Sequence, residues 1–153
     1  MLELPHTVVG AAIAVKIGNP ALALPLALAS HFVLDVLPHW NPHLNSELKN
    51  HGKVTSRTTA FIALDSVGSL VAGFGIASTV LPNFNHFVVV LLGSFLAILP
   101  DLVEAPHYFL RKEHSLVSKF ITFQKSIQND APVWIGIPVQ LLIMGASLWW
   151  IFN

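Results

Sequence analysis

Long apolar stretches dominate this sequence and leave few folds open to it. Five can be delimited, at about residues 4–17, 20–37, 60–81, 84–99 and 131–152. Hydrophobic residues make up 54% of the 153 residues and charged residues only 10%, whereas soluble domains carry about 25% charged residues. Because isolated strands cannot satisfy their backbone polar groups in lipid, these stretches predict membrane-spanning helices.

A helix needs roughly 20 apolar residues to cross a bilayer. The last four stretches qualify as spans, the fourth can continue toward Leu110, and the first could be tilted or could cross only part of the membrane. Within the polar segment 111–130, residues 115–127 place apolar side chains at helical spacing, which predicts an amphipathic surface helix. We therefore predict one all-α domain over residues 1–153, a polytopic membrane bundle of about five membrane helices plus one cytoplasmic amphipathic helix.

Lysine and arginine predict the orientation of this bundle. With five spans, one side of the membrane carries seven basic residues and the other side only Lys16. The seven are Lys49, Lys53, Arg57, Arg111, Lys112, Lys119 and Lys125. Because cytoplasmic loops are rich in Lys and Arg, we predict an inner or plasma membrane protein with a cytoplasmic N-terminus and an external C-terminus. Residues 1–6 lack a basic region, so we expect a mature N-terminus and not a signal peptide.

The remaining composition narrows the chemistry. The formal net charge is zero, so no nucleic acid partner is expected. There is no cysteine, so any bound metal must be held by histidine and carboxylate groups. The chain has eight histidines, and such groups fit zinc first, with manganese or iron as alternatives.

The end of the second apolar stretch combines three ionisable residues, His31, Asp35 and His39. Residues four apart lie on one face of a helix, about one turn from each other. His31 and Asp35 could therefore share one metal ion, with His39 a turn further along. The alternative is a hydrogen-bonded His–Asp pair that only ties this helix to a neighbour.

On the predicted topology, several other segments deliver ionisable groups to the same cytoplasmic membrane depth. We predict metal ligands, for one or two ions, among His6, His31, Asp35, His39, Asp65, Asp101, His107 and His114. Three of these have a specific structural alternative. His39, just after Pro38, can be an interfacial residue beside Trp40. Asp65 can bond a helix N-terminus or Ser69, and His114 can cap the amphipathic helix.

Segments 34–40 and 99–108 look alike, since each has an Asp followed by Pro, His and an aromatic residue. This pattern is consistent with a short internal duplication in which each half supplies one side of a site. Pro38 and Pro106 are expected to end or kink their helices. Either effect would turn His39 and His107 toward a shared cavity.

These motifs resemble those of small membrane-bound proteins known as metal-dependent hydrolases, which have inner-membrane members in bacteria. His6-Thr7 is similar to their early His-Thr, and Glu113-His114-Ser115 to part of their Thr-His-Ser stretch. Leu99-Pro100-Asp101 matches the first half of their Pro-Asp-x-Asp-His stretch, with Val103 and Glu104 where Asp and His would stand. A second likeness, to zinc-dependent phospholipase C and single-strand nucleases, covers only residues 31–39.

The resemblance and the predicted site together suggest a membrane-embedded, metal-dependent hydrolase of a phosphoester in a lipid or lipid-linked substrate. Asp35 or Asp101 would position the water, or Glu104 would take its proton. Arg57, Arg111 and Lys112 could hold the phosphate. The alternatives are a metal-ion or proton transporter and a non-catalytic membrane protein with a structural metal site. The sequence leaves an oligomer open.

Overall fold

The computed structural model describes residues 1–153 as seven helices without strands, which confirms the all-helical prediction. In chain order they are α1 (Glu3–Ile17), α2 (Pro20–Val36), α3 (Leu44–His51), α4 (Ser56–Ser78), α5 (Phe84–Leu110), α6 (Ser115–Ile127) and α7 (Val133–Phe152). The continuation of the fourth apolar stretch to Leu110 and the amphipathic helix at 115–127 agree with the prediction. The short helix α3, between α2 and α4, was not predicted.

Three helices, α4, α5 and α7, are long and apolar enough to cross a membrane. The predicted number of five spanning helices is therefore corrected. Helix α1 has 15 residues and α2 has 17. At about 1.5 Å per residue these helices extend about 22 and 26 Å, less than the roughly 30 Å of a hydrocarbon core. Gly18 and Asn19 separate them and Pro20 is the first residue of α2, so neither helix can lengthen at that end.

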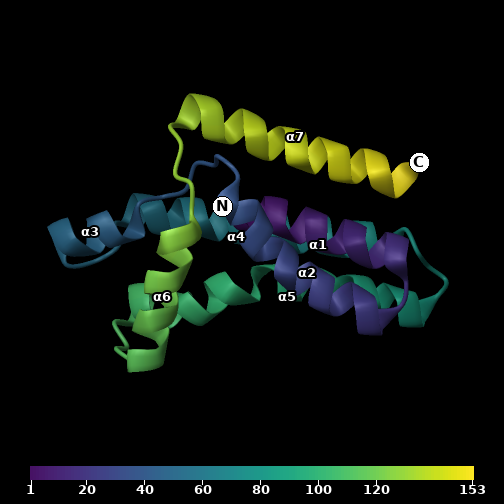
Figure 1. Ribbon diagram of the computed structural model, residues 1–153, viewed down its shortest axis with the longest axis horizontal. Helices are drawn as coiled ribbons and strands as arrows, with labels where there is room; N and C mark the ends of the chain where they lie inside the picture. The colour runs from purple at the N-terminus through teal and green to yellow at the C-terminus, as the bar shows by residue number, and fades with distance from the viewer.

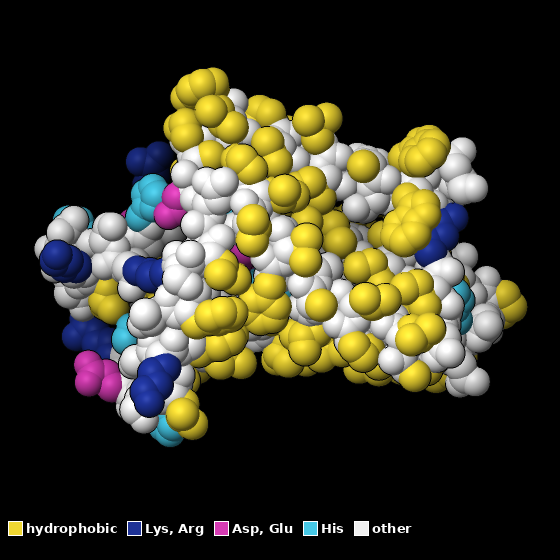
Figure 2. Space-filling view, in the orientation of Figure 1, with side chains coloured by type: hydrophobic (Ala, Val, Ile, Leu, Met, Phe, Trp, Pro, Cys, Tyr) yellow, Lys and Arg dark blue, Asp and Glu magenta, His cyan; other side chains and the backbone are white.

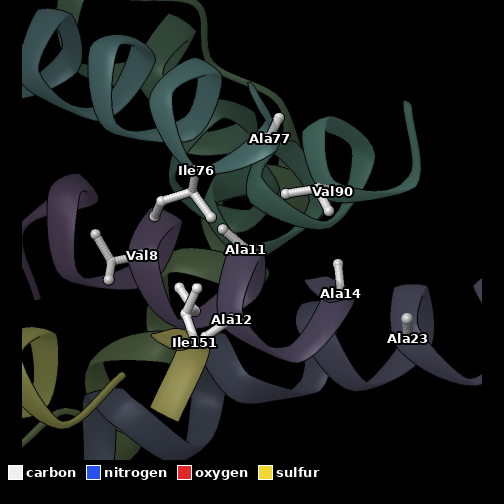
Figure 3. Packing of buried hydrophobic residues seen from close by; sticks show 9 residues of the cluster. All are labelled: Val8, Ala11, Ala12, Ala14, Ala23, Ile76, Ala77, Val90 and Ile151. Atoms are coloured by element: carbon white, nitrogen blue, oxygen red, sulfur yellow. The ribbon is translucent and has the colours of Figure 1, made fainter. Parts of the chain in front are cut away.

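Helix α1 lies at the centre of the bundle. Helices α1, α2, α4, α5 and α7 run along the long axis of the molecule, and α6 crosses near one end (Figure 1). Helix α1 packs against α2, α4, α5 and α7, so the shortest of these five helices is the most enclosed. Figure 3 shows the side chains that meet around it, namely Val8, Ala11, Ala12, Ala14, Ala23, Ile76, Ala77, Val90 and Ile151.

Small residues bring α1 and α5 into close contact. A Cβ added at Gly10 would lie 2.5 Å from Ala97 Cβ and 2.6 Å from the Gly93 carbonyl oxygen. Only glycine therefore permits this separation of the two helices. His6 lies about one turn before Gly10, and Asp101 lies about one turn after Ala97. The close contact thus places these two side chains at the same end of the bundle.

Charged and histidine side chains gather at the end of the molecule that carries α3 and α6, whereas apolar side chains cover much of the rest (Figure 2). At this end the Glu47 carboxylate of α3 accepts hydrogen bonds from the Thr55 backbone N–H and from the Thr55 and Thr58 hydroxyls. The Thr58 hydroxyl, with the Thr55 groups, lowers the pKa of Glu47 below its usual value. These bonds tie α3 to the first turn of α4.

Candidate metal centre

Three ionisable side chains from three helices meet at the polar end of the bundle. His6 of α1, His31 of α2 and Asp101 of α5 each offer one ligand atom, and these atoms lie within 4.8 Å of one another. The two imidazole rings are stacked, with centroids 4.1 Å apart. Both histidines are fully buried, whereas the Asp101 side chain is 25% exposed. This group could hold a metal ion.

Asp35 lies next to both histidines of this group. It has more polar partners than any other carboxylate near the group. Its Oδ1 atom accepts from the Met1 amino group at 2.6 Å and lies 3.3 Å from His6 Nε2 and 3.9 Å from His39 Nε2. Its Oδ2 atom lies 3.5 Å from His31 Nε2 and accepts from Gln128 Nε2 at 3.3 Å. The predicted turn between His31 and Asp35 is thus present, and both residues are fully buried.

Two of the histidines are oriented by backbone carbonyl groups. His31 Nδ1 lies 2.8 Å from the Ala97 oxygen, and His39 Nδ1 lies 2.8 Å from the Leu37 oxygen. A carbonyl oxygen only accepts, so Nδ1 carries the proton and Nε2 of each neutral ring offers a lone pair. Burial lowers the pKa of His39, which favours this neutral form. A carbonyl partner on the other ring nitrogen is typical of metal-ligating histidines.

Two buried imidazole nitrogens at this site lack hydrogen-bond partners, as expected of atoms that bind a cation. His6 Nδ1 and His39 Nε2 are buried without a hydrogen-bond partner, and His6 Nε2 has only the Asp35 carboxylate beside it, at 3.3 Å. Such groups normally have partners, because burying an unpaired polar atom costs about 1–3 kcal/mol. Imidazole lone pairs and carboxylate oxygens that converge on one point attract a divalent ion. The donor set of nitrogen and oxygen suits zinc, manganese or iron.

A polar cavity of about 370 Å³ borders this group. Asp101 belongs both to the group and to the cavity wall, so the cavity leads to it. The Glu104 side chain also lines the cavity, and its Oε1 atom is buried without a partner. Five carboxylates and one cationic side chain face this space, namely Glu3, Asp65, Asp101, Glu104, Asp130 and Lys125.

The segment between α2 and α3, together with the first turn of α3, forms one wall of the cavity and is held in place at two points. Asn45 Nδ2 donates to the Tyr108 hydroxyl of α5 at 2.7 Å. His39 donates its backbone N–H to the Asn129 oxygen, and Ala131 donates to the His39 oxygen. Helix α2 ends at Val36, just before Pro38, as predicted. This early end brings His39 to Asp35.

Of the eight predicted ligands, the structure brings His6, His31, Asp35, His39 and Asp101 together and uses the other three differently. Asp65 accepts from the backbone N–H groups of Glu3 and Leu4, so it caps the start of α1. His114 Nδ1 accepts from the Leu116 N–H and caps α6. The His107 ring packs edge-on against Tyr108 and is not part of the metal-competent group, which we define as His6, His31 and Asp101. Pro106 lies inside α5 and does not end it.

Of the residues predicted for catalysis and substrate binding, some line the cavity and others do not. Glu104 lines the cavity, but Asp35 does not. Asp35 is therefore placed to contact the histidines and not a substrate in the cavity. Arg57, Arg111 and Lys112 are exposed and do not line the cavity. The basic side chain that does is Lys125.

Sequence reasoning missed one buried residue of the site, Gln124 of α6. Its side chain is 1% exposed, it lines the cavity, and its Nε2 atom lies 3.2 Å from His31 Nε2. One signal could have indicated it. Gln124 follows Phe120 by four residues and thus occupies the apolar stripe of an amphipathic helix, where an amide is out of place unless it has a polar partner.

None of the protein families, curated proteins or solved structures compared with this chain matches it. The resemblance to membrane-bound metal-dependent hydrolases therefore stays a prediction. What the structure establishes is an all-helical protein with three helices able to cross a membrane and a buried His–His–Asp group that could hold an ion.

Asp35→Asn should destabilise the protein by about 3–5 kcal/mol, because it leaves the buried Met1 amino group without its counter-ion. The measurement is unfolding of the purified protein in detergent by increasing SDS. Asp130→Asn serves as control, since that side chain is exposed and forms no ion pair. Equal stability of the two variants would show that Asp35 does not hold the segments together.

Proposed function

We propose that this protein is a membrane-embedded, metal-dependent hydrolase that cleaves a phosphoester in a lipid or lipid-linked substrate. The observation that carries the proposal is the position of Asp101. One residue belongs both to a buried group able to hold an ion and to the wall of a polar cavity at one end of an apolar bundle. A substrate headgroup that enters this cavity would meet the ion.

The residues around the ion have separable tasks in this proposal. A divalent ion at such a site supplies a Lewis acid that activates water at neutral pH and offsets charge on a phosphoryl oxygen. His6, His31 and Asp101 would hold the ion, while Asp35 would orient the His6 ring and the Ala97 carbonyl the His31 ring. Glu104, three residues after Asp101 on α5, would accept a proton from the attacking water through its unpaired Oε1 atom. Lys125 would attract the anionic headgroup.

The surroundings of the cavity support a lipid substrate. The outward side chains of α4, α5 and α7 are largely apolar (Figure 2). Helix α6 crosses near one end of the bundle (Figure 1), and its residues Gln124 and Lys125 line the cavity. An acyl chain could therefore stay in the bilayer while its headgroup enters the site. We infer that this end faces the cytoplasm, because seven of the eight Lys and Arg residues belong to its segments.

The test is release of phosphate or of a phosphorylated headgroup from vesicles that contain lipid phosphates and phosphodiesters. The full-length protein, reconstituted with Zn²⁺ or Mn²⁺, should release product from at least one substrate class, and chelation should stop the release. If the metal-loaded protein cleaves none of the panel, the hydrolase proposal fails. A structural metal site would then account for the buried histidines.

One observation favours a second candidate, a metal-ion transporter. Five carboxylates against one lysine make the cavity attractive to cations, so it suits ion entry. The second candidate predicts flux of Zn²⁺ or Mn²⁺ into liposomes that contain the protein. The hydrolase proposal predicts that such liposomes stay tight to these ions.

A further inference from the structure

Gln124 joins the surface helix α6 to the candidate metal centre. The side-chain amide of Gln124, in α6, donates to His31. The amide of Gln128, just after α6, donates to Asp35. Phe120 and Phe123 of the same helix pack against Phe32 of α2. Helix α6 is thus held over the centre by an aromatic contact and by these two amides.

The hydrogen bond from Gln124 uses the electron pair that an ion would need. In the neutral His31 ring, Nδ1 carries the proton that goes to Ala97, so Nε2 has a single lone pair. The Gln124 amide donates to this lone pair at 3.2 Å. An ion held by His6, His31 and Asp101 requires the same lone pair. The hydrogen bond and the ion therefore exclude each other.

The other atom of the same amide lacks a partner. Gln124 Oε1 is buried without any hydrogen-bond donor, on a side chain that is 1% exposed and lines the cavity. An amide has nearly the same shape when its nitrogen and oxygen exchange places. Such an exchange would turn the N–H away from His31 and bring the unpaired oxygen beside the ion.

We propose that Gln124 is a fourth ligand of the ion through Oε1, and that ion binding exchanges the two ends of its amide. This inference rests on the proposed metal centre and adds to it a ligand from α6. Two histidines, one carboxylate and one amide make up the number of ligands that zinc prefers. Catalytic zinc sites keep one position for water or substrate, so the neutral amide is the ligand that the attacking water would replace. Binding of the ion and docking of α6 are then linked.

The test measures the affinity of the purified full-length protein for Zn²⁺ in detergent, by competition with a coloured chelator. Gln124→Leu should weaken Zn²⁺ binding about tenfold or more, since replacing even a hydrogen-bond partner of a metal ligand typically lowers metal affinity 10–100-fold. The matched control is Gln140→Leu. Gln140 is as buried as Gln124, but its bonds go to the backbone of Leu2, Trp40 and Gly136. The affinity of the Gln140→Leu variant for Zn²⁺ should be unchanged.

The sign of the change separates a ligand from a mere competitor. If Gln124 only competes with the ion for His31, Gln124→Leu would bind Zn²⁺ as tightly as the unchanged protein or more tightly, and this would overturn the proposal. Gln124→Glu covers the case in which the leucine variant does not fold. It keeps the oxygen and loses the donor, so it should bind Zn²⁺ at least as tightly, and weaker binding contradicts a ligand role.

The same titration distinguishes this inference from the proposed function. If the unchanged protein binds no Zn²⁺, both the metal centre and the role of Gln124 are wrong. If it binds Zn²⁺ and Gln124→Leu binds equally well, only the role of Gln124 is wrong. As a second readout, Zn²⁺ should slow hydrogen exchange of the α6 amides in the unchanged protein and leave it unaffected in Gln124→Leu.

Discussion

His31→Ala should lower the affinity for a divalent ion by more than about 100-fold, because it removes a ligand and not only a partner of a ligand. His31 is the most connected of the three residues in the metal-competent group. Its Nε2 atom lies 3.5 Å from Asp35 and 3.7 Å from Asp101, so it faces both carboxylates. The measurement is the ratio of metal to protein after dialysis against a limiting concentration of Zn²⁺.

The matched control for this loss is His86→Ala. His86 belongs to the first turn of α5, and its Nε2 atom lies 3.1 Å from the Ala14 oxygen at the far end of α1. Removing it also costs one histidine and one contact between helices, but it should leave the bound metal unchanged. Equal metal content in the two variants would mean that the ion, if there is one, does not bind to His31.

Glu104→Gln should lower kcat of the metal-loaded protein by about 10²–10⁴-fold and leave its metal content unchanged. The amide keeps the size of the side chain but cannot accept a proton from water. Because Glu104 is outside the His6–His31–Asp101 group, the ion should stay. The rate is measured on the substrate class that the unchanged protein cleaves.

Glu113→Gln controls for loss of a negative charge at the same end of the molecule. Glu113 is exposed, lies between α5 and α6, and does not line the cavity. Its kcat should equal that of the unchanged protein. A Glu104→Gln variant that retains full activity would remove Glu104 from the chemistry and leave Asp101 as the remaining carboxylate beside both the ion and the cavity.

Much of the site could be predicted because its strongest signals are local or follow from charge. The turn from His31 to Asp35 is visible in the spacing of the two residues. The approach of His6 and Asp101 to that turn was inferred from the distribution of Lys and Arg, which assigned the ends of separate helices to one side of the membrane. The early end of α2 followed from Pro38.

Other features depend on contacts that one sequence does not display. The α6 helix was predicted from its apolar spacing, but its docking over His31 depends on tertiary packing by Phe32, Phe120 and Phe123. Without that packing, Gln124 is only a polar residue on a surface helix. Asp65 was a candidate ligand because it is a carboxylate at the expected depth. Its two bonds to the start of α1 depend on how α1 meets α4.

The number of spanning helices was overestimated for a related reason. Apolar composition marks a helix that avoids water, but such a helix can be covered by lipid or by other helices. Helix α1 is covered by four neighbours and has Ala and Gly at its contacts, as a central helix requires. Helices α1 and α2, with 15 and 17 residues, are shorter than α4, α5 and α7, and α2 is apolar but too short to be a candidate span.

X-ray absorption at the zinc edge of the loaded full-length protein tests most directly whether His6, His31 and Asp101 hold a divalent ion at one end of the bundle. We expect a coordination shell of nitrogen and oxygen with the scattering signature of two imidazoles, reduced to one imidazole in His6→Ala. A spectrum of the unchanged protein without imidazole scattering would show that these histidines do not hold the ion.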